Sequence, residues 1–173
     1  MKCTAIALIL TPAVALTQVQ GASHEHGVGH LDIAFSDEAF SLSLAVPAAD
    51  IVGFEGPAET DNDRALVAVA ISDLSKPLGL FVPSEEAACV TVSANVTLSG
   101  EGLGQGAANT SAEQHSEFLA DYVIQCQDMA ALAGIRFGYF DRFENAQKLM
   151  VQVSRSGENL AYDVTRSRPD LGL

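Results

Sequence analysis

Three histidines lie within seven residues near the start of the chain, in the segment His24-Glu25-His26-Gly27-Val28-Gly29-His30, and the whole chain has only four. In an extended segment, side chains two residues apart project to the same side, so His24 and His26 face the same way. Imidazole is a borderline ligand that suits zinc, copper and nickel, and Glu25 or Asp32 adds a carboxylate oxygen. The cluster predicts a divalent metal site, with Zn²⁺ as the leading candidate. The alternative is a solvated polar segment that binds nothing.

The fourth histidine, His115, lies at the end of a glycine-rich stretch, with Glu113 and Glu117 two residues to either side. A lone histidine in a loop is usually solvated. Its acidic neighbours nevertheless suit a fourth ligand or the centre of a weaker second site. The metal ligands that the sequence predicts are therefore His24, His26, His30 and His115.

The histidine spacing does not by itself predict catalysis. A zinc hydrolase needs a general base beside the metal, and the sequence identifies none. We therefore expect a non-catalytic protein with no catalytic residues. Two alternatives stay open: a zinc-dependent hydrolase that uses the same histidines, and a structural or interaction module in which they are incidental.

The first 22 residues have the layout of a secretory signal peptide. A basic start precedes an apolar run from residue 5 to residue 16, and a more polar stretch with the small residues Val19 and Gly21 follows. The apolar run is too short to span a membrane comfortably. We expect a signal peptide at residues 1–22 and one domain at residues 23–173, exported in soluble form without membrane insertion of the mature chain.

The exact cleavage position decides whether a second kind of metal site exists. Cleavage after Gly21 leaves a mature chain that begins Ala22-Ser23-His24. Its amine, two amides and imidazole form a square-planar set of nitrogens, a geometry diagnostic for Cu²⁺ or Ni²⁺. Cleavage one residue earlier or later removes this set.

The chain is strongly acidic, with a formal net charge of −13 and nine basic residues. So few basic residues cannot form a convincing phosphate-binding stripe, which argues against nucleic acid as a partner. The acidity suits a protein that attracts cations, and equally one that acid simply keeps soluble.

Alternating apolar and polar residues predict six strands, near residues 31–35, 40–46, 90–98, 118–124, 149–153 and 160–164, and Ile135 and Phe137 suggest a further short strand. The clearest alternation runs from Val90 to Leu98. Thr60 and Asp63 resemble a capping box that begins a helix with an apolar face, and Lys76-Pro77 ends it. The fold class that this predicts is α+β: an antiparallel β-sheet with one main helix packed on it, in a single domain.

Two cysteines, Cys89 and Cys126, remain after removal of the signal peptide. An even pair in an oxidising compartment predicts one disulfide, with unrelated thiols or a metal pair as the alternatives. If the strands near residues 90–98 and 118–124 pair as a long hairpin, both cysteines meet at its open end.

Three segments together resemble one family, the bacterial periplasmic proteins associated with zinc uptake (ZrgA-like, formerly a domain of unknown function). The first is His24-Glu25-His26-Gly27 running into Leu31-Asp32-Ile33, and the second is the stretch from Pro47 to Glu55. The third runs from Phe137 through Phe143 to Leu149-Met150-Val151-Gln152. The paired cysteines also sit where the family has them, and the resemblance covers nearly all of the mature chain.

The resemblance implies a soluble periplasmic protein that binds Zn²⁺ and assists a high-affinity zinc importer of the ABC class. His24 and His26 match the family motif, whereas His30 does not. Family members often carry a long run of histidines and acids where this chain has the loop of residues 99–116, and only His115 remains here.

Overall fold

The computed structural model describes residues 26–100 and 116–173. The expected signal peptide, His24 and His115 lie outside these residues. The larger sheet contains β1 (Val28–Phe35), β2 (Ala39–Pro47), β4 (Cys89–Ser99), β5 (Glu117–Cys126), β7 (Lys148–Arg155) and β8 (Glu158–Thr165). The smaller sheet contains β3 (Phe81–Pro83), β6 (Gly134–Phe137) and β9 (Asp170–Gly172). Their strand orders are β4-β5-β2-β1-β7-β8 and β3-β6-β9.

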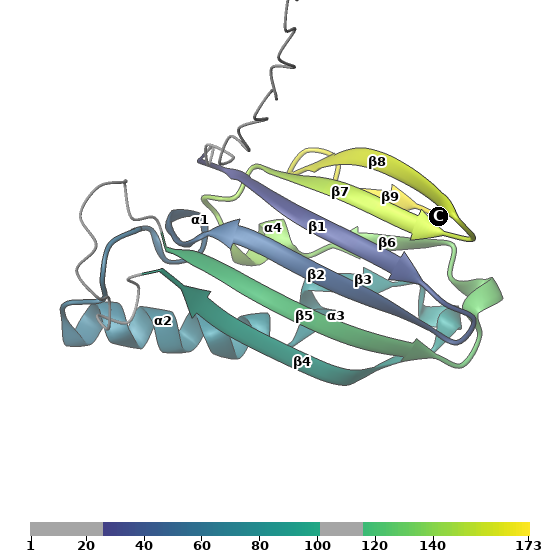
Figure 1. Ribbon diagram of the computed structural model, residues 1–173, viewed down its shortest axis with the longest axis horizontal. Coiled ribbons are helices and arrows are strands. Elements are labelled where there is room, and N and C mark those ends of the chain that lie inside the picture. The colour runs from purple at the N-terminus through teal and green to yellow at the C-terminus, as the bar shows by residue number, and fades with distance from the viewer. Residues whose placement is uncertain (1–25, 101–115) are drawn as a thin grey trace, which may run out of the picture.

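Short helices and the small sheet cover one face of the large sheet, and its other face is open (Figure 1). The helices are α1 (Ala48–Val52), α2 (Asp61–Leu74), α3 (Pro77–Leu80) and α4 (Tyr139–Arg142), with 3₁₀ turns at Glu85–Ala87 and Met129–Ala131. Within the described residues, no helix is long and apolar enough to cross a membrane.

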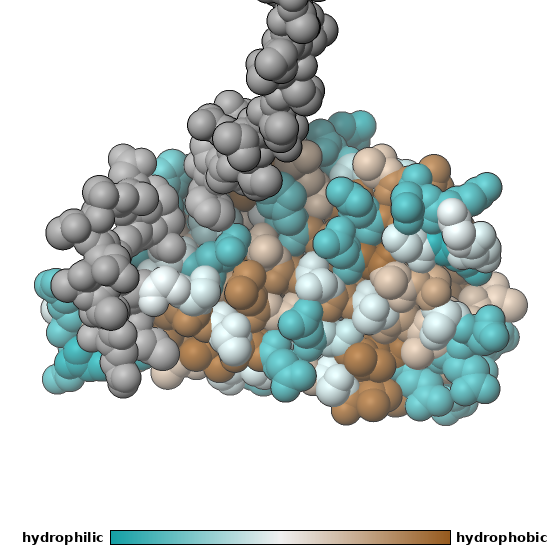
Figure 2. Space-filling view, in the orientation of Figure 1, coloured by the Kyte–Doolittle hydropathy of each residue, from teal (hydrophilic) through white to brown (hydrophobic). Residues whose placement is uncertain are grey.

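The alternation in the first two strands separates a buried face from an open one, as the sequence predicts. Leu31 and Ile33 on β1 are each 1% exposed, and Leu42 on β2 is as deeply buried. The side chains between them, such as His30 and Asp32, are exposed. Figure 2 shows this open face, where hydrophilic and hydrophobic residues are mixed.

The broad α+β class is confirmed, but three details of the expected fold were wrong. The large sheet is mixed, because β1 runs parallel to β7, with Leu31 opposite Val151. A second sheet exists, built from strands of three or four residues. The large sheet is covered by several short helices and this second sheet, and not by one main helix. The short strand expected at Ile135 and Phe137 is confirmed as β6. The three-residue strands β3 and β9, and pairings between segments distant in sequence, leave no local periodic pattern.

The β4–β5 hairpin and its disulfide are confirmed. Cys89 lies opposite Cys126 in the ladder, and their sulfur atoms are bonded at 2.05 Å. A β-bulge between Thr91 and Ser93 shifts the alternation of β4 by one residue. Val90 and Val92 are therefore 56% and 60% exposed, although the sequence pattern placed them on the same face as Leu98.

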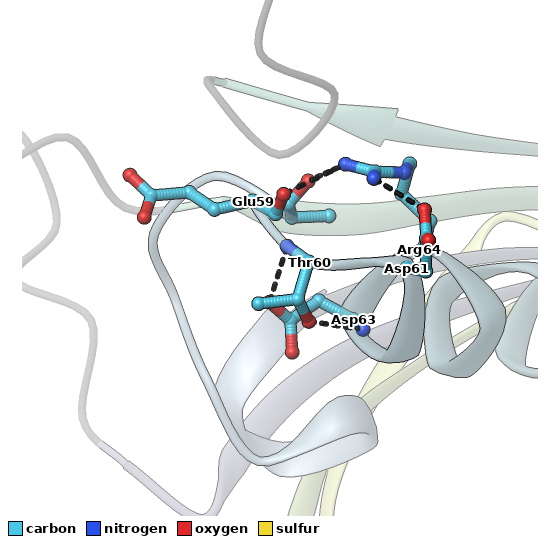
Figure 3. A network of polar contacts seen from close by, with 6 residues as sticks. Glu59, Thr60, Asp61, Asp63 and Arg64 are labelled. Atoms are coloured by element: carbon cyan, nitrogen blue, oxygen red, sulfur yellow. Dashed lines mark hydrogen bonds and ion pairs between the residues drawn. The ribbon is translucent and has the colours of Figure 1, made fainter.

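The expected start of the helix is confirmed at α2. The hydroxyl of Thr60 accepts from the Asp63 N–H at 3.1 Å, and the Asp63 carboxylate accepts from the Thr60 N–H at 3.0 Å. Arg64 adds bonds to the carbonyl of Glu59 and to the carboxylate of Asp61 (Figure 3). The two bonds between Thr60 and Asp63 satisfy backbone N–H donors at the start of the helix.

Candidate metal centre

The residue after His26 is fixed by hydrogen bonds on both sides. Gly27 adopts a φ of 81°, in the left-handed region that favours glycine. Its N–H donates to Oδ1 of Asp50 at 2.8 Å, and its carbonyl accepts from the N–H groups of Gln147 and Lys148, each at 2.9 Å. The N-terminal histidine segment therefore enters β1 at a defined position beside α1.

The link from α4 to β7, which provides two of those bonds, is itself held by Arg166. Its guanidinium donates at 2.5–2.8 Å to four backbone carbonyls, those of Phe140, Phe143, Glu144 and Ala146. The Arg166 N–H also donates to the carbonyl of Gln147 at 3.1 Å. Charge-assisted bonds of this kind are stronger than neutral ones, so this link is a firm support for Gly27.

The segment after α1 brings a carboxylate to His26. Gly53, with a φ of 85°, ends α1 in a left-handed conformation, and the chain turns back toward the start of β1. Oε1 of Glu55 then lies 3.2 Å from Nδ1 of His26. The His26 side chain is 74% exposed and that of Glu55 only 19%. A proton on Nδ1 bonds Glu55 and leaves Nε2, on the exposed ring, as the lone pair for a metal.

The same place receives the end of the loop that precedes β5. The Ser116 N–H donates to the carbonyl of Glu55 at 3.3 Å, and its carbonyl accepts from the Ala48 N–H at 2.8 Å. Ser116 is only 1% exposed. His115 directly precedes Ser116 in the sequence, although its own position lies outside the described residues. The fold therefore brings Ser116, the residue after His115, and His26, which follows His24 by two residues, to the region of Glu55.

In the part of the chain that the structure describes, His30 does not group with the His26–Glu55 pair. It projects from β1 on the open face of the large sheet, where its neighbour in the β7 ladder is Met150. Among residues 26–100 and 116–173, no three His, Cys, Asp or Glu side chains are grouped so as to hold a metal ion. Within the part of the chain that the structure describes, the His26–Glu55 pair therefore does not form a complete metal site.

Asp50 lies behind this pair, in the interior. It is 3% exposed, and its Oδ2 has no hydrogen-bond partner among the described residues. Burial raises the pKa of its carboxyl, against the hydrogen bond from Gly27 and the charge of His26, which lower it, while Glu55 raises it further. The hydroxyl of Tyr139, fully buried nearby, also finds no partner in the described part of the chain, and burial followed by the charge of Asp50 raises its pKa.

Sequence reasoning missed Glu55 and Asp50 as members of this region. Asp50 lies in the short helix α1 and Glu55 in the connection after it, and the sequence shows no periodic pattern at either place. The available signal was their place in the stretch from Pro47 to Glu55, which carries the family resemblance and puts an acid on either side of Gly53.

This α+β domain, with an exposed histidine in contact with a carboxylate, is a candidate metal-binding protein. A family model described as ZrgA family zinc uptake protein matches residues 23–173. The chain belongs to this family. No curated protein matches it.

Proposed function

We propose that this protein is a periplasmic zinc-binding protein that holds or delivers Zn²⁺ for a high-affinity zinc importer of the ABC class. Membership of the zinc uptake family supports the role in zinc uptake. The acidic composition, with a net charge of −13, favours the local accumulation of cations.

The observation that carries the proposal is the contact between Nδ1 of His26 and the Glu55 carboxylate at 3.2 Å. Histidines that bind zinc almost always donate their other ring N–H to a carboxylate, carbonyl or water, which fixes the tautomer and raises the basicity of the ligand. His26 has this arrangement, because its Nδ1 contacts Glu55 and its second nitrogen lies on an exposed ring.

Two further histidines are proposed as zinc ligands beside His26. Structural zinc sites usually take four ligands, so His26 needs partners. His24 precedes it by two residues, and His115 is adjacent to Ser116, whose backbone contacts Glu55. His30, on the open face of the sheet, is the remaining candidate and is tested separately.

The proposed role is non-catalytic. A zinc hydrolase needs a base that activates metal-bound water. Glu55, the carboxylate in contact with His26, bonds the imidazole. The hydrolase alternative requires a base other than Glu55 beside the metal, and the interaction-module alternative requires that no metal binds.

The test is a zinc competition titration of protein exported to a bacterial periplasm, purified and stripped of metal. We expect about one Zn²⁺ per chain. His26→Ala and the double variant His24→Ala/His26→Ala should weaken binding strongly, and Glu55→Gln should weaken it about 10- to 100-fold, as for other second-shell partners. His30→Ala is the matched control, because it removes an exposed histidine of the same strand region.

Unchanged zinc affinity in the double variant would refute the assignment of this site. A loss in His30→Ala as large as that in His26→Ala would move the site to the open face of the sheet. Absence of zinc binding by the wild-type protein would favour the interaction module.

A further inference from the structure

We propose that Asp50 is the positioning residue of the metal site: its buried carboxylate holds the Gly27 N–H, and so His26, while its negative charge favours a cation at His26. This inference rests on the proposed function, since it assigns a role toward the metal to a residue that does not touch it.

A single hydrogen bond connects the Asp50 carboxylate to the backbone of the residue after His26. Its Oδ1 accepts from the Gly27 N–H at 2.8 Å, and Gly27 is the residue next to His26. On the other side of His26, Glu55 follows Asp50 by five residues, after the turn at Gly53. One short segment thus fixes the backbone of the histidine through Asp50 and its imidazole through Glu55.

Asp50 is not itself a ligand. Within the described residues, it does not form a three-member group with His26 and Glu55 that could hold a metal ion. Its side chain is closed off from solvent, with 3% of the residue exposed. It therefore acts through Gly27 and through its charge.

The negative charge of Asp50 destabilises the folded protein at this buried position. Burying a carboxylate without full hydrogen bonding disfavours the folded state, and Oδ2 of Asp50 has no partner among the residues described. An asparagine would keep an oxygen to accept from Gly27 without burying a charge. The carboxylate therefore contributes something that the single hydrogen bond does not require.

A bound cation would supply that contribution. The charges of His26 and Glu55 both act on the Asp50 carboxyl, so the three groups lie within electrostatic reach of one another. A divalent cation at His26 would be attracted by the Asp50 charge, and the solvent around the exposed His26 ring would screen that attraction in part. The charge that destabilises the metal-free protein would then favour the metal-bound one.

The experiment compares Asp50→Asn with the wild type in two measurements: zinc affinity by competition titration, and the melting temperature of the metal-free protein. Tyr139→Phe is the control matched in place, because it removes the unpartnered hydroxyl near Asp50 without changing a charge. Asp128→Asn is the control matched in chemistry, because Asp128 accepts from the N–H groups of Ala130 and Ala131 at 2.9 and 3.2 Å, at the other end of β5.

We expect Asp50→Asn to weaken zinc binding about 10- to 100-fold, the range of second-shell substitutions, while the melting temperature of the metal-free protein holds or rises. Both control variants should bind zinc like the wild type. Zinc affinity unchanged in Asp50→Asn would overturn the inference and leave the proposed function intact. Affinity and melting temperature that fall together would overturn it as well, because Asp50 would then be a structural residue only. A wild-type protein that binds no zinc removes the proposed function itself, and this inference with it.

Discussion

Gly29 and Val46 approach each other so closely that a Cβ atom on Gly29 would lie 2.4 Å from Cγ1 of Val46. The same atom would lie 2.8 Å from Cδ2 of Leu149. Val46 and Leu149 are both fully buried, at 0% exposure, in the strands on either side of β1. Glycine at position 29, inside the histidine segment, therefore allows β2, β1 and β7 to pack together there.

Gly29→Ala should destabilise the protein, because the added methyl group must displace two buried side chains. Overpacking of this kind typically costs about 1–3 kcal/mol. The measurement is urea unfolding of the metal-free protein. Gly56→Ala is the matched control, since a Cβ atom there meets nothing within 4 Å. Equal stability of the two variants would show that the strands beside Gly29 move apart readily.

Loss of the disulfide should lower the free energy of unfolding more than either Gly29→Ala or Thr60→Ala does. Cys89 and Cys126 are 37 residues apart, and the loop-closure estimate for that length is about 4 kcal/mol, an upper expectation. The double variant Cys89→Ala/Cys126→Ala, compared with the wild type by urea unfolding with and without reductant, measures this contribution. Reductant should lower the stability of the wild type only. Two reactive thiols in the denatured, unreduced mature protein would contradict the bridge.

Local patterns predicted the elements whose side chains alternate strictly. Leu31 and Ile33, then Phe40 and Leu42, mark β1 and β2, and their buried positions follow from the period of the strand. The alternation of the two strands and the positions of the two cysteines predicted the same hairpin register, and the structure confirms it. The bulge near Val92 escaped this reasoning, since one inserted residue inverts the alternation without changing residue types.

The candidate site depended on contacts that a sequence pattern does not encode. Composition and spacing predicted His26 as a candidate metal ligand. Glu55 reaches its imidazole only because Gly53 reverses the chain after α1. The parallel pairing of β1 with β7, which anchors Gly27 through Gln147, joins segments far apart in sequence. Long-range backbone pairing of this kind has no signature in either segment alone.

Thr60→Ala should weaken α2. The substitution removes the hydroxyl that accepts from the Asp63 N–H at 3.1 Å, and loss of such a cap costs about 0.5–2 kcal/mol. Urea unfolding of the variant measures the cost. Thr60→Ser is the control, because serine keeps the hydroxyl. A Thr60→Ser variant as unstable as Thr60→Ala would show that the hydroxyl is not the cause.

The capping box should also give the protein a pH-dependent contribution to stability. Hydrogen bonds from Thr60 lower the pKa of the Asp63 carboxyl below its ordinary value. The folded state therefore favours the ionised form, so this contribution is complete above the unfolded pKa of about 3.9 and is lost as the pH falls through the lower folded value. Wild type should exceed Asp63→Asn in stability at neutral pH, and the difference should shrink on acidification below about pH 4. A difference that stays constant across this range would contradict the shift.

The mature N-terminus is predicted to decide whether copper competes for the zinc site. If cleavage falls after Gly21, the chain begins Ala22-Ser23-His24, and these residues lie outside those that the structure describes. The terminal amine, two deprotonated amides and the His24 imidazole then form the square-planar set that suits Cu²⁺ or Ni²⁺ and gives zinc no advantage.

Mass spectrometry of the exported protein identifies the first residue, and a copper titration followed by visible absorption detects the square-planar complex. With Ala22 at the terminus, Cu²⁺ should bind His24 and weaken zinc binding by removing one ligand. His24→Ala should then abolish the copper absorption, whereas His26→Ala should leave it in place, because His26 takes no part in the four-nitrogen set. A mature chain that begins at any other residue removes the copper site. The contact between His26 and Glu55 does not depend on that terminus, so the proposed zinc site would stand.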